Sequence, residues 1–276
     1  MSSLLTRRGL LGLPLIALPL AACTSTPTVA DADGARLRAA LAGPQRSDAN
    51  RARDGARHPY ETLRFFGLAP GQTVVEIAPG GGWYTEVLAP YLRDSGRLYV
   101  AHEPADAQDD GARRSRKRFE EKLAKEPAVY DRVVVGDLPA GITPPGGADL
   151  VLTFRNLHNW IEAGQLDAML QSFRAVLKPG GVLGVEEHRA PPGTSIARTI
   201  ATGYVPEALV IERAGAAGFD LVGRSEVNAN ARDSHDHPDG VWSLPPTLRG
   251  GAVDRDRFLA IGESDRMTLK FARRAG

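Results

Sequence analysis

The stretch VVEIAPGGGWYTEV, residues 74–87, places three consecutive glycines shortly after an apolar run that contains an acid. Its β-branched residues up to Ile77 predict a buried strand, and the residues from Trp83 predict a helix over 83–92. Glycines between the two allow positive φ and place no Cβ in the way of a ligand. The stretch therefore predicts a strand–turn–helix unit that brings its backbone close to a flat polar ligand. A tight turn without a ligand is the alternative.

Strand-like and helix-like segments alternate through the rest of the chain. Short apolar runs separated by helical spacing predict a mostly parallel sheet with helices on both faces. The expected fold class is α/β, as one doubly wound, Rossmann-like domain with seven strands. The expected strands are TVVEIA, RLYVAH, RVVVGD, ADLVLTF, VLGVEEH, FDLVGRSEV and RMTLKFARR. Residues 48–68 are expected to form one helix with Leu63 and Phe66 inward and Gly67 at its end.

The first residues have the features of an export signal. Arg7 and Arg8 precede the apolar stretch GLLGLPLIALPLAA, which is typical of a signal peptide over 1–22 and resembles a twin-arginine signal. The motif LAAC resembles a lipobox, in which Cys23 becomes lipidated after cleavage and tethers a protein to a membrane surface. A plain secretory signal with an incidental cysteine is the alternative.

This leader sets the expected domain organisation. Residues 23–47 are small, polar and rich in alanine, which predicts a tether or a loosely packed helix. Residues 48–276 are expected to form the folded domain. The expected location is the periplasmic side of a bacterial membrane, and a cytoplasmic location is the alternative.

Composition restricts the possible partners. The formal net charge is +1 and no basic stripe interleaves with aromatic residues, which argues against nucleic acid. Cys23 is the only cysteine, so a disulfide within the chain and a thiol–metal cluster are excluded. The long segment 227–257 is rich in aspartate and histidine, and we interpret it as a substrate lid rather than a metal site, with a plain polar loop as the alternative. No metal is expected, and the sequence gives no indication of the oligomeric state.

The residues of the glycine turn narrow the choice of ligand. A phosphate-binding Walker loop needs Gly-Lys-Ser or Gly-Lys-Thr, but Trp83 and Tyr84 stand there. A dinucleotide fingerprint needs glycine or alanine where Thr85 stands. A serine hydrolase is disfavoured because no Gly-x-Ser-x-Gly elbow follows a strand.

The pattern from Glu76 to Gly82, acid-x-small-x-Gly-x-Gly, instead resembles motif I of class I S-adenosylmethionine-dependent methyltransferases, with Ala78 where that family usually has its first glycine. Further matches follow in the family's order, including LKPGGVL before the fifth strand. With HPYETLRFFGL and the LRG…DR tail, the chain is similar to a group of exported bacterial predicted methyltransferases. The resemblance covers roughly residues 48–276.

The resemblance implies S-adenosylmethionine as the cofactor and assigns residues to it. The cofactor-binding residues that it implies are Glu76, Ala78, Gly80 and Gly82 in the turn, Glu103 for the ribose, Asp137 for the adenine amino group, and Arg155 and Asn156 near the reactive methyl. Glu103 comes one residue after the family's acidic position, which falls on His102.

Three residues at the ends of the fourth and fifth strands are candidates for catalysis: His158, Glu186 and His188. Parallel sheets of this kind bind ligands at that edge. A base is needed only where the methyl acceptor is a poor nucleophile, and His158 is otherwise a packed loop histidine. The expected reaction is methyl transfer to a small molecule or an envelope component. The alternative function is a non-catalytic, exported ligand-binding or scaffold module on the same fold.

Overall fold

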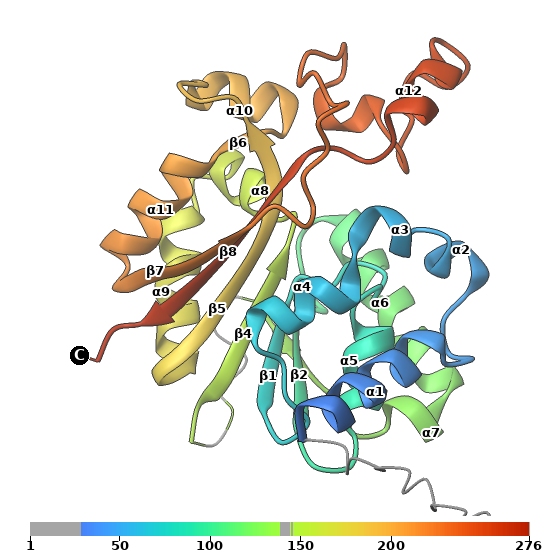
Figure 1. The fold of residues 1–276 in the computed structure, drawn as a ribbon, viewed down its shortest axis with the longest axis vertical. Coiled ribbons are helices and arrows are strands. Elements are labelled where there is room, and N and C mark those ends of the chain that lie inside the picture. The colour runs from blue at the N-terminus through green and yellow to red at the C-terminus, as the bar shows by residue number, and fades with distance from the viewer. Residues whose placement is uncertain (1–28, 139–143, 145, 276) are drawn as a thin grey trace, which may run out of the picture.

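The computed structural model describes residues 29–138, 144 and 146–275. Seven strands form one mixed sheet in the order β3-β2-β1-β4-β5-β8-β7, and the short β6 pairs with the end of β5 (Figure 1). The strands from β3 to β5 in this order are parallel to one another, and β8 runs antiparallel to both β5 and β7. The expected doubly wound sheet with seven mostly parallel strands is therefore confirmed.

The strands are β1 (Thr73–Ile77), β2 (Arg97–His102), β3 (Val134–Asp137), β4 (Ala148–Phe154), β5 (Leu177–Ala190), β6 (Val205–Pro206), β7 (Phe219–Ser225) and β8 (Arg266–Arg273). The helices before β3 are α1 (Val29–Ala42), α2 (Asp48–Arg51), α3 (Asp54–Arg57), α4 (Pro59–Phe66), α5 (Thr85–Leu92), α6 (Asp110–Lys125) and α7 (Pro127–Tyr130). The later helices are α8 (Leu157–Glu162), α9 (Leu166–Val176), α10 (Ile196–Thr202), α11 (Glu207–Ala216), the 3-10 helix η1 (Gly240–Ser243) and α12 (Arg255–Ile261).

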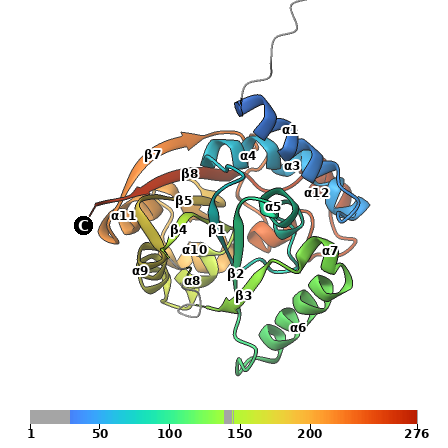
Figure 2. The ribbon, with the colours of Figure 1, turned by 90° about the horizontal axis from the view of Figure 1, so that it is seen from below.

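Two apolar cores lie on opposite faces of the sheet. Side chains of a strand alternate between faces, so the neighbours Val74 and Val75 enter different cores, and both are fully buried. Val74 packs with residues of α1, α4, α5 and α6, whereas Val75 packs with residues of α8, α9 and α11. The view from below shows these two helical layers on either side of the strands (Figure 2).

The single helix expected over 48–68 is wrong: the structure has three short helices there. His58, between α3 and α4, has a φ of 41°, in the left-handed region. Pro59 follows it, and a proline disfavours helical geometry at the preceding residue. The expected end is confirmed, because Gly67 caps α4 with a φ of 86°, and Leu63 and Phe66 are buried as expected.

Residues 29–47 pack on the domain and do not form a free tether. Helix α1 lies against α5, and its Leu37 is fully buried in the core. Arg46, 1% exposed, forms an ion pair of 2.6 Å with Asp54. The expected signal peptide and Cys23 lie outside the described residues. Among the helices that are described, none has the length and apolarity to cross a bilayer.

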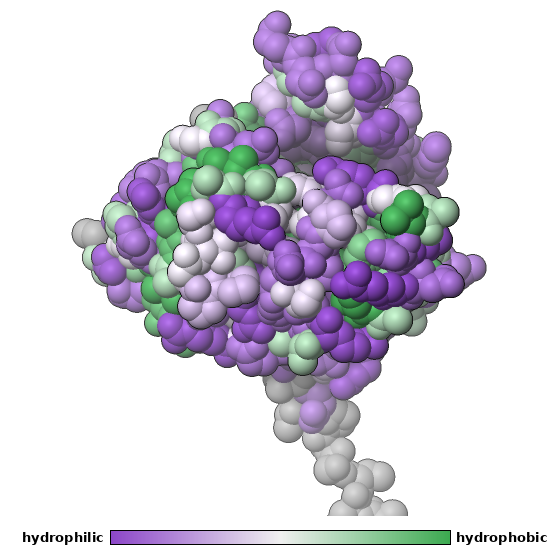
Figure 3. Space-filling view, turned by 90° about the horizontal axis from the view of Figure 1, so that it is seen from above, coloured by the Kyte–Doolittle hydropathy of each residue, from purple (hydrophilic) through white to green (hydrophobic). Residues whose placement is uncertain are grey.

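The segment between β7 and β8 folds over the carboxyl edge of the sheet, where η1 contacts α10 and α12 lies farther from it (Figure 1). Polar contacts within the segment and with Tyr204 hold it there. The carboxylate of Asp233 accepts a hydrogen bond from the Tyr204 hydroxyl at 2.8 Å and pairs with His237 at 2.8 Å. Seen from above, this face is mostly hydrophilic and its apolar side chains form small groups (Figure 3).

Candidate functional site

Two cavities open at the carboxyl edge of the sheet. The first, of about 420 Å³, has Arg53, Arg57 and Arg155 in its wall, and we call it the arginine cavity. The second, of about 500 Å³, is lined by Glu103 together with residues of the β3 end, α8 and α9, and we call it the Glu103 cavity. Ala78 and Asn156 line both cavities, so the two spaces meet beside the glycine turn.

The glycine turn lies against the arginine cavity. Ala78 has a φ of 49°, a conformation that glycine takes with less strain. A Cβ added to Gly80 or Gly81 meets nothing within 4 Å, and both residues line the cavity. Gly82 differs, because a Cβ there would lie 2.9 Å from the Phe119 ring. Two of the three glycines therefore leave open space for a ligand, and the third allows close packing against α6.

Glu76, the residue before the last of β1, lies beneath this turn, 1% exposed and in the wall of the arginine cavity. Its carboxylate accepts a hydrogen bond of 2.6 Å from the Thr85 hydroxyl. Burial raises the pKa of Glu76 to about 7, although the bond from Thr85 opposes this shift. A ligand that brings a cation next to this carboxylate would favour its ionised form.

The end of β2 places Glu103 in the wall of its cavity. His102 occupies the expected acidic position but has a structural role: its Nδ1 accepts a hydrogen bond from the Glu103 backbone N–H at 2.7 Å. Its Nε2 therefore carries the proton and lies 3.3 Å from the Gly80 carbonyl oxygen. His102 thus ties the glycine turn to Glu103, and burial lowers the pKa of His102.

Asp137 ends β3 outside the linings of both cavities. Its half-exposed carboxylate forms an ion pair of 2.8 Å with Arg116 of α6. The following residue, Leu138, lines the Glu103 cavity instead. Leu138 therefore lies in the wall of the Glu103 cavity, where the sequence analysis expected Asp137.

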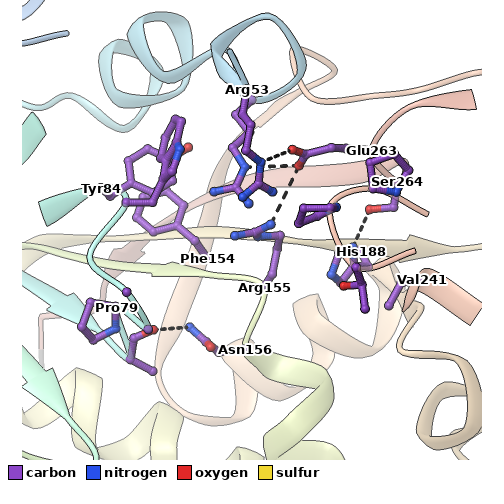
Figure 4. A pocket seen from close by; sticks show the side chains of 18 of the residues that line it. Arg53, Pro79, Tyr84, Phe154, Arg155, Asn156, His188, Val241, Glu263 and Ser264 are labelled. Carbon is purple, nitrogen blue, oxygen red and sulfur yellow. Dashed lines mark hydrogen bonds and ion pairs between the residues drawn. The ribbon is translucent and has the colours of Figure 1, made fainter. Parts of the chain in front are cut away.

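Arg155 and Asn156 follow β4 directly, where the two cavities meet. The side-chain amide of Asn156 donates to the carbonyl oxygens of Ile77 and Ala78, at 3.3 and 3.4 Å, which fixes the start of the glycine turn. Figure 4 shows Asn156 pointing toward this turn. Arg155 has a φ of 59° and lines the arginine cavity. Burial lowers the pKa of Arg155 to about 10, and the neighbouring charge of Arg57 acts in the same direction.

His158, at the start of α8, forms a pair with Glu187 of β5. Its Nδ1 lies 3.0 Å from a carboxylate oxygen of Glu187, which is fully buried. A carboxylate ion only accepts hydrogen bonds, so this Nδ1 carries the proton and Nε2 has a free lone pair in the neutral ring. Because His158 lines the arginine cavity, the pair has the arrangement of a general base held by a carboxylate.

His188 and Glu186 flank that pair in different ways. His188 lines the arginine cavity, and its Nδ1 lies 2.5 Å from the hydroxyl oxygen of Ser264. Burial lowers the pKa of His188 well below its usual value, and nearby cationic groups add to the effect, so the ring is neutral. Glu186 lies behind the wall, where it accepts a hydrogen bond from the Tyr84 hydroxyl at 3.1 Å.

One cluster has the spacing of a metal site. His158, Glu187 and His188 each offer a ligand atom, and these atoms lie within 4.8 Å of one another. However, the carboxylate of Glu187 already accepts backbone N–H groups of Leu157 at 2.6 Å and of His188 at 2.8 Å. The protein satisfies this carboxylate without an ion, so we interpret the cluster as the support of a base.

The sequence analysis missed a group of arginines around Glu263. The carboxylate of Glu263 pairs with Arg53 at 2.7 Å, with Arg266 at 2.9 Å and with Arg57 at 3.2 Å. Arg155 approaches the same carboxylate from the other side of the cavity, at 3.9 Å (Figure 4). The spacing of Arg53 and Arg57 is a local signal that they share a helical face, but Glu263 lies about 200 residues later in the chain.

Comparisons with known proteins identify the fold of the chain. No protein-family model matches the chain. An uncharacterized methyltransferase of Synechocystis sp. is 34% identical over 132 residues, which cover 48% of this chain and 53% of that protein. The chain therefore spans about half the length of this curated relative.

Solved structures match more of the chain at lower identity. A SAM-dependent methyltransferase from Aquifex aeolicus, 20% identical, matches with a TM-score of 0.50 over 71% of this chain and 93% of that one. The [4+2]-cyclase SpnF, 17% identical, matches with a TM-score of 0.59 over 91% of this chain and 98% of that one. The chain thus has the fold of the class I S-adenosylmethionine-dependent methyltransferases.

Proposed function

We propose that the protein is an S-adenosylmethionine-dependent methyltransferase acting on a small molecule or an envelope component. The observation that carries this proposal is the pair of cavities that meet at Ala78 and Asn156. The Glu103 cavity has an acid, Glu103, just after β2. The arginine cavity has His158, which pairs with the carboxylate of Glu187. The fold and the Synechocystis relative support the same reaction class, although a fold by itself does not define an activity.

The residues present fit the cofactor. Open space above Gly80 and Gly81 leaves room for a ligand beside the turn. Glu103 would hold the ribose hydroxyls, and the Glu76 carboxylate would pair with the amino group of the methionyl end. When bound, the cofactor supplies an activated methyl group. The protein then has to orient the acceptor, exclude water and remove a proton where the acceptor is a hydroxyl.

His158 is the residue that we propose for proton removal. Glu187 holds its Nδ1–H, so the opposite nitrogen is free to accept a proton from the acceptor. The imidazolium that forms is stabilised by the same buried carboxylate. The neutral ring of His188 lies beside it, with ring centroids 5.3 Å apart, and adds no positive charge to oppose that protonation.

Binding can be tested by calorimetry on the full chain with S-adenosylmethionine and S-adenosylhomocysteine. Gly81→Asp adds a charged side chain in the open space beside the turn, and we expect it to weaken binding at least about 100-fold, roughly 3 kcal/mol. Gly71→Asp is the matched control, because a Cβ there also meets nothing within 4 Å and the residue precedes the sheet. Equal affinity in the two variants would remove the proposed cofactor site.

Turnover can be tested as release of S-adenosylhomocysteine over a panel of small hydroxyl and amine acceptors. With an acceptor that is turned over, His158→Ala should lower kcat by about 10² to 10⁴ and leave cofactor affinity unchanged. Tight cofactor binding without turnover of any acceptor would favour the alternative, a non-catalytic ligand-binding module. An unchanged kcat in the variant would exclude His158 as the base.

We also propose that the protein is exported and lipid-anchored through Cys23 on the periplasmic side of a membrane. The twin-arginine pair and the lipobox-like LAAC support this location. Cell fractionation should find the native protein in the membrane fraction and Cys23→Ala in the soluble periplasm. A double Arg7→Lys, Arg8→Lys variant should stay in the cytoplasm, and a native protein that is wholly cytoplasmic and soluble would contradict the proposal.

A further inference from the structure

Positive charge exceeds negative charge around Glu263. Four guanidinium groups and two carboxylates lie together: Arg53, Arg57, Arg155 and Arg266 around Glu263 and Glu186. Burial alone would raise the pKa of Glu263, but the guanidinium charges outweigh it and hold the pKa at about 2, so this carboxylate is ionised. Even with both carboxylates ionised, the cluster keeps a positive excess.

Two other carboxylates near the cavity do little to reduce this excess. Burial raises the pKa of Glu76 to about 7, so its charge is incomplete at neutral pH, and Thr85 holds it beneath the turn. Glu187 is engaged by backbone N–H groups and by the His158 ring on the far side of the wall. Neither carboxylate forms an ion pair with the arginines of the cavity in the described part of the chain.

Hydrogen-bond donors of these arginines also lack partners. The Nη2 atom of Arg53 is buried and has no acceptor among the described residues. The Arg155 guanidinium forms no side-chain hydrogen bond with the same residues, and its ion pair with Glu263, at 3.9 Å, is too long for one. The Arg57 side chain is 3% exposed, and its described hydrogen bond uses Nε alone. A buried donor without an acceptor, such as the Arg53 Nη2, costs free energy, and an anion bound in the cavity would satisfy it.

Resting on the proposed function, we propose that the methyl acceptor is an acidic small molecule whose carboxylate or phosphate is held by Arg53, Arg57 and Arg155. Guanidinium groups bind these two anions through paired N–H donors. The cofactor does not remove the charge excess, because its sulfonium and ammonium groups outnumber its single carboxylate. Phe154 and Trp242 line the same cavity and offer apolar contact to the body of such a molecule.

The experiment uses the full chain saturated with S-adenosylhomocysteine and three aromatic probes in ligand-observed NMR: benzoate, phenyl phosphate and benzamide. We expect both anions to bind at least ten-fold more tightly than the neutral amide. Arg155→Met should abolish this preference, and Arg155→Lys should keep part of it because the charge remains without the paired donors. Arg224→Met is the control: its partner Glu207 lies outside the cavity, and the preference should be intact.

The anion held by the arginines could instead be the carboxylate of the cofactor itself. A second experiment distinguishes a cofactor carboxylate from an acidic acceptor. If Arg155→Met weakens S-adenosylhomocysteine but not 5′-methylthioadenosine, which lacks the amino acid, the arginine serves the cofactor and our inference is overturned. Equal binding of the three probes to the wild type, or a preference that survives Arg155→Met, also overturns it. Arg53→Met gives a second test if circular dichroism shows that Arg155→Met does not fold.

Failure of the proposed function has a different signature. In that case neither S-adenosylhomocysteine nor 5′-methylthioadenosine binds the wild type. The three probes are then compared without cofactor, where a preference for the anions that Arg155→Met abolishes still supports an acidic ligand.

Discussion

The two cavities at the edge of the sheet differ in how the chain builds them. The Glu103 cavity is made by strand ends and the helices directly after them, and its wall contains a single ionisable side chain among the described residues, Glu103. The arginine cavity combines α3, the glycine turn, the end of β4 and the segment before β8, and it is crowded with charge. A cavity made by strand ends suits a ligand common to many proteins of one fold, whereas a cavity made by distant segments suits a ligand specific to one group.

The largest expected effect concerns the ion pairs of the arginine cavity. Glu263→Gln leaves the guanidinium groups around it without their shared counter-ion, and we expect it to lower the free energy of unfolding by about 3–5 kcal/mol. Urea denaturation measures the change. Glu226→Gln is the control, because Glu226 pairs with Arg189 at the surface and its loss should cost less than about 1 kcal/mol. Similar losses in both variants would show that the cluster is no more than a surface network.

A second prediction concerns Glu76, beneath the turn. Its pKa is about 7 in the folded protein and near 4.5 when unfolded, so the native state binds the proton more tightly. Unfolding stability therefore falls as pH rises from about 4.5 through 7, by up to about 3 kcal/mol. Glu76→Gln does not titrate, so its stability relative to the wild type should increase between pH 5 and pH 8 without cofactor. A difference independent of pH, measured by urea denaturation, would contradict the raised pKa.

The smallest expected effect concerns two glycines of the turn, of which Gly81 faces open space and Gly82 packs against Phe119. Gly82→Ala meets the Phe119 ring and keeps a φ of 77°, so we expect it to lower unfolding stability by about 2 kcal/mol. Gly81→Ala has open space and no positive φ, so its stability should change by less than about 1 kcal/mol. Thermal denaturation of the two variants checks the contrast, and equal losses would show that both glycines serve packing.

Several residues that the sequence proposes for the site lie near strand ends, and the structure places them in the cavity walls. Glu76 lies at the end of β1, Glu103 and Asn156 lie just beyond β2 and β4, and all three line the cavities because parallel strands bring their carboxyl ends to one edge. His158 follows in the first turn of α8. Two other residues that the sequence proposes for the cofactor lie outside both cavity linings, because side-chain packing and ion pairing determine their positions. Gly82 lies against Phe119 outside both cavity linings, and Asp137 pairs with Arg116 while Leu138 takes the place at the wall.

The sequence by itself determined the class of sheet and the position of the glycine turn, because alternating apolar runs and glycine conformations are local properties. Only the tertiary structure decided which charges meet. Arg53 and Glu263 are separated by about 200 residues, and their contact depends on the break before Pro59 and on how the segment before β8 folds over the sheet. Electrostatic interactions depend on distance in space and on burial, neither of which the order of residues specifies.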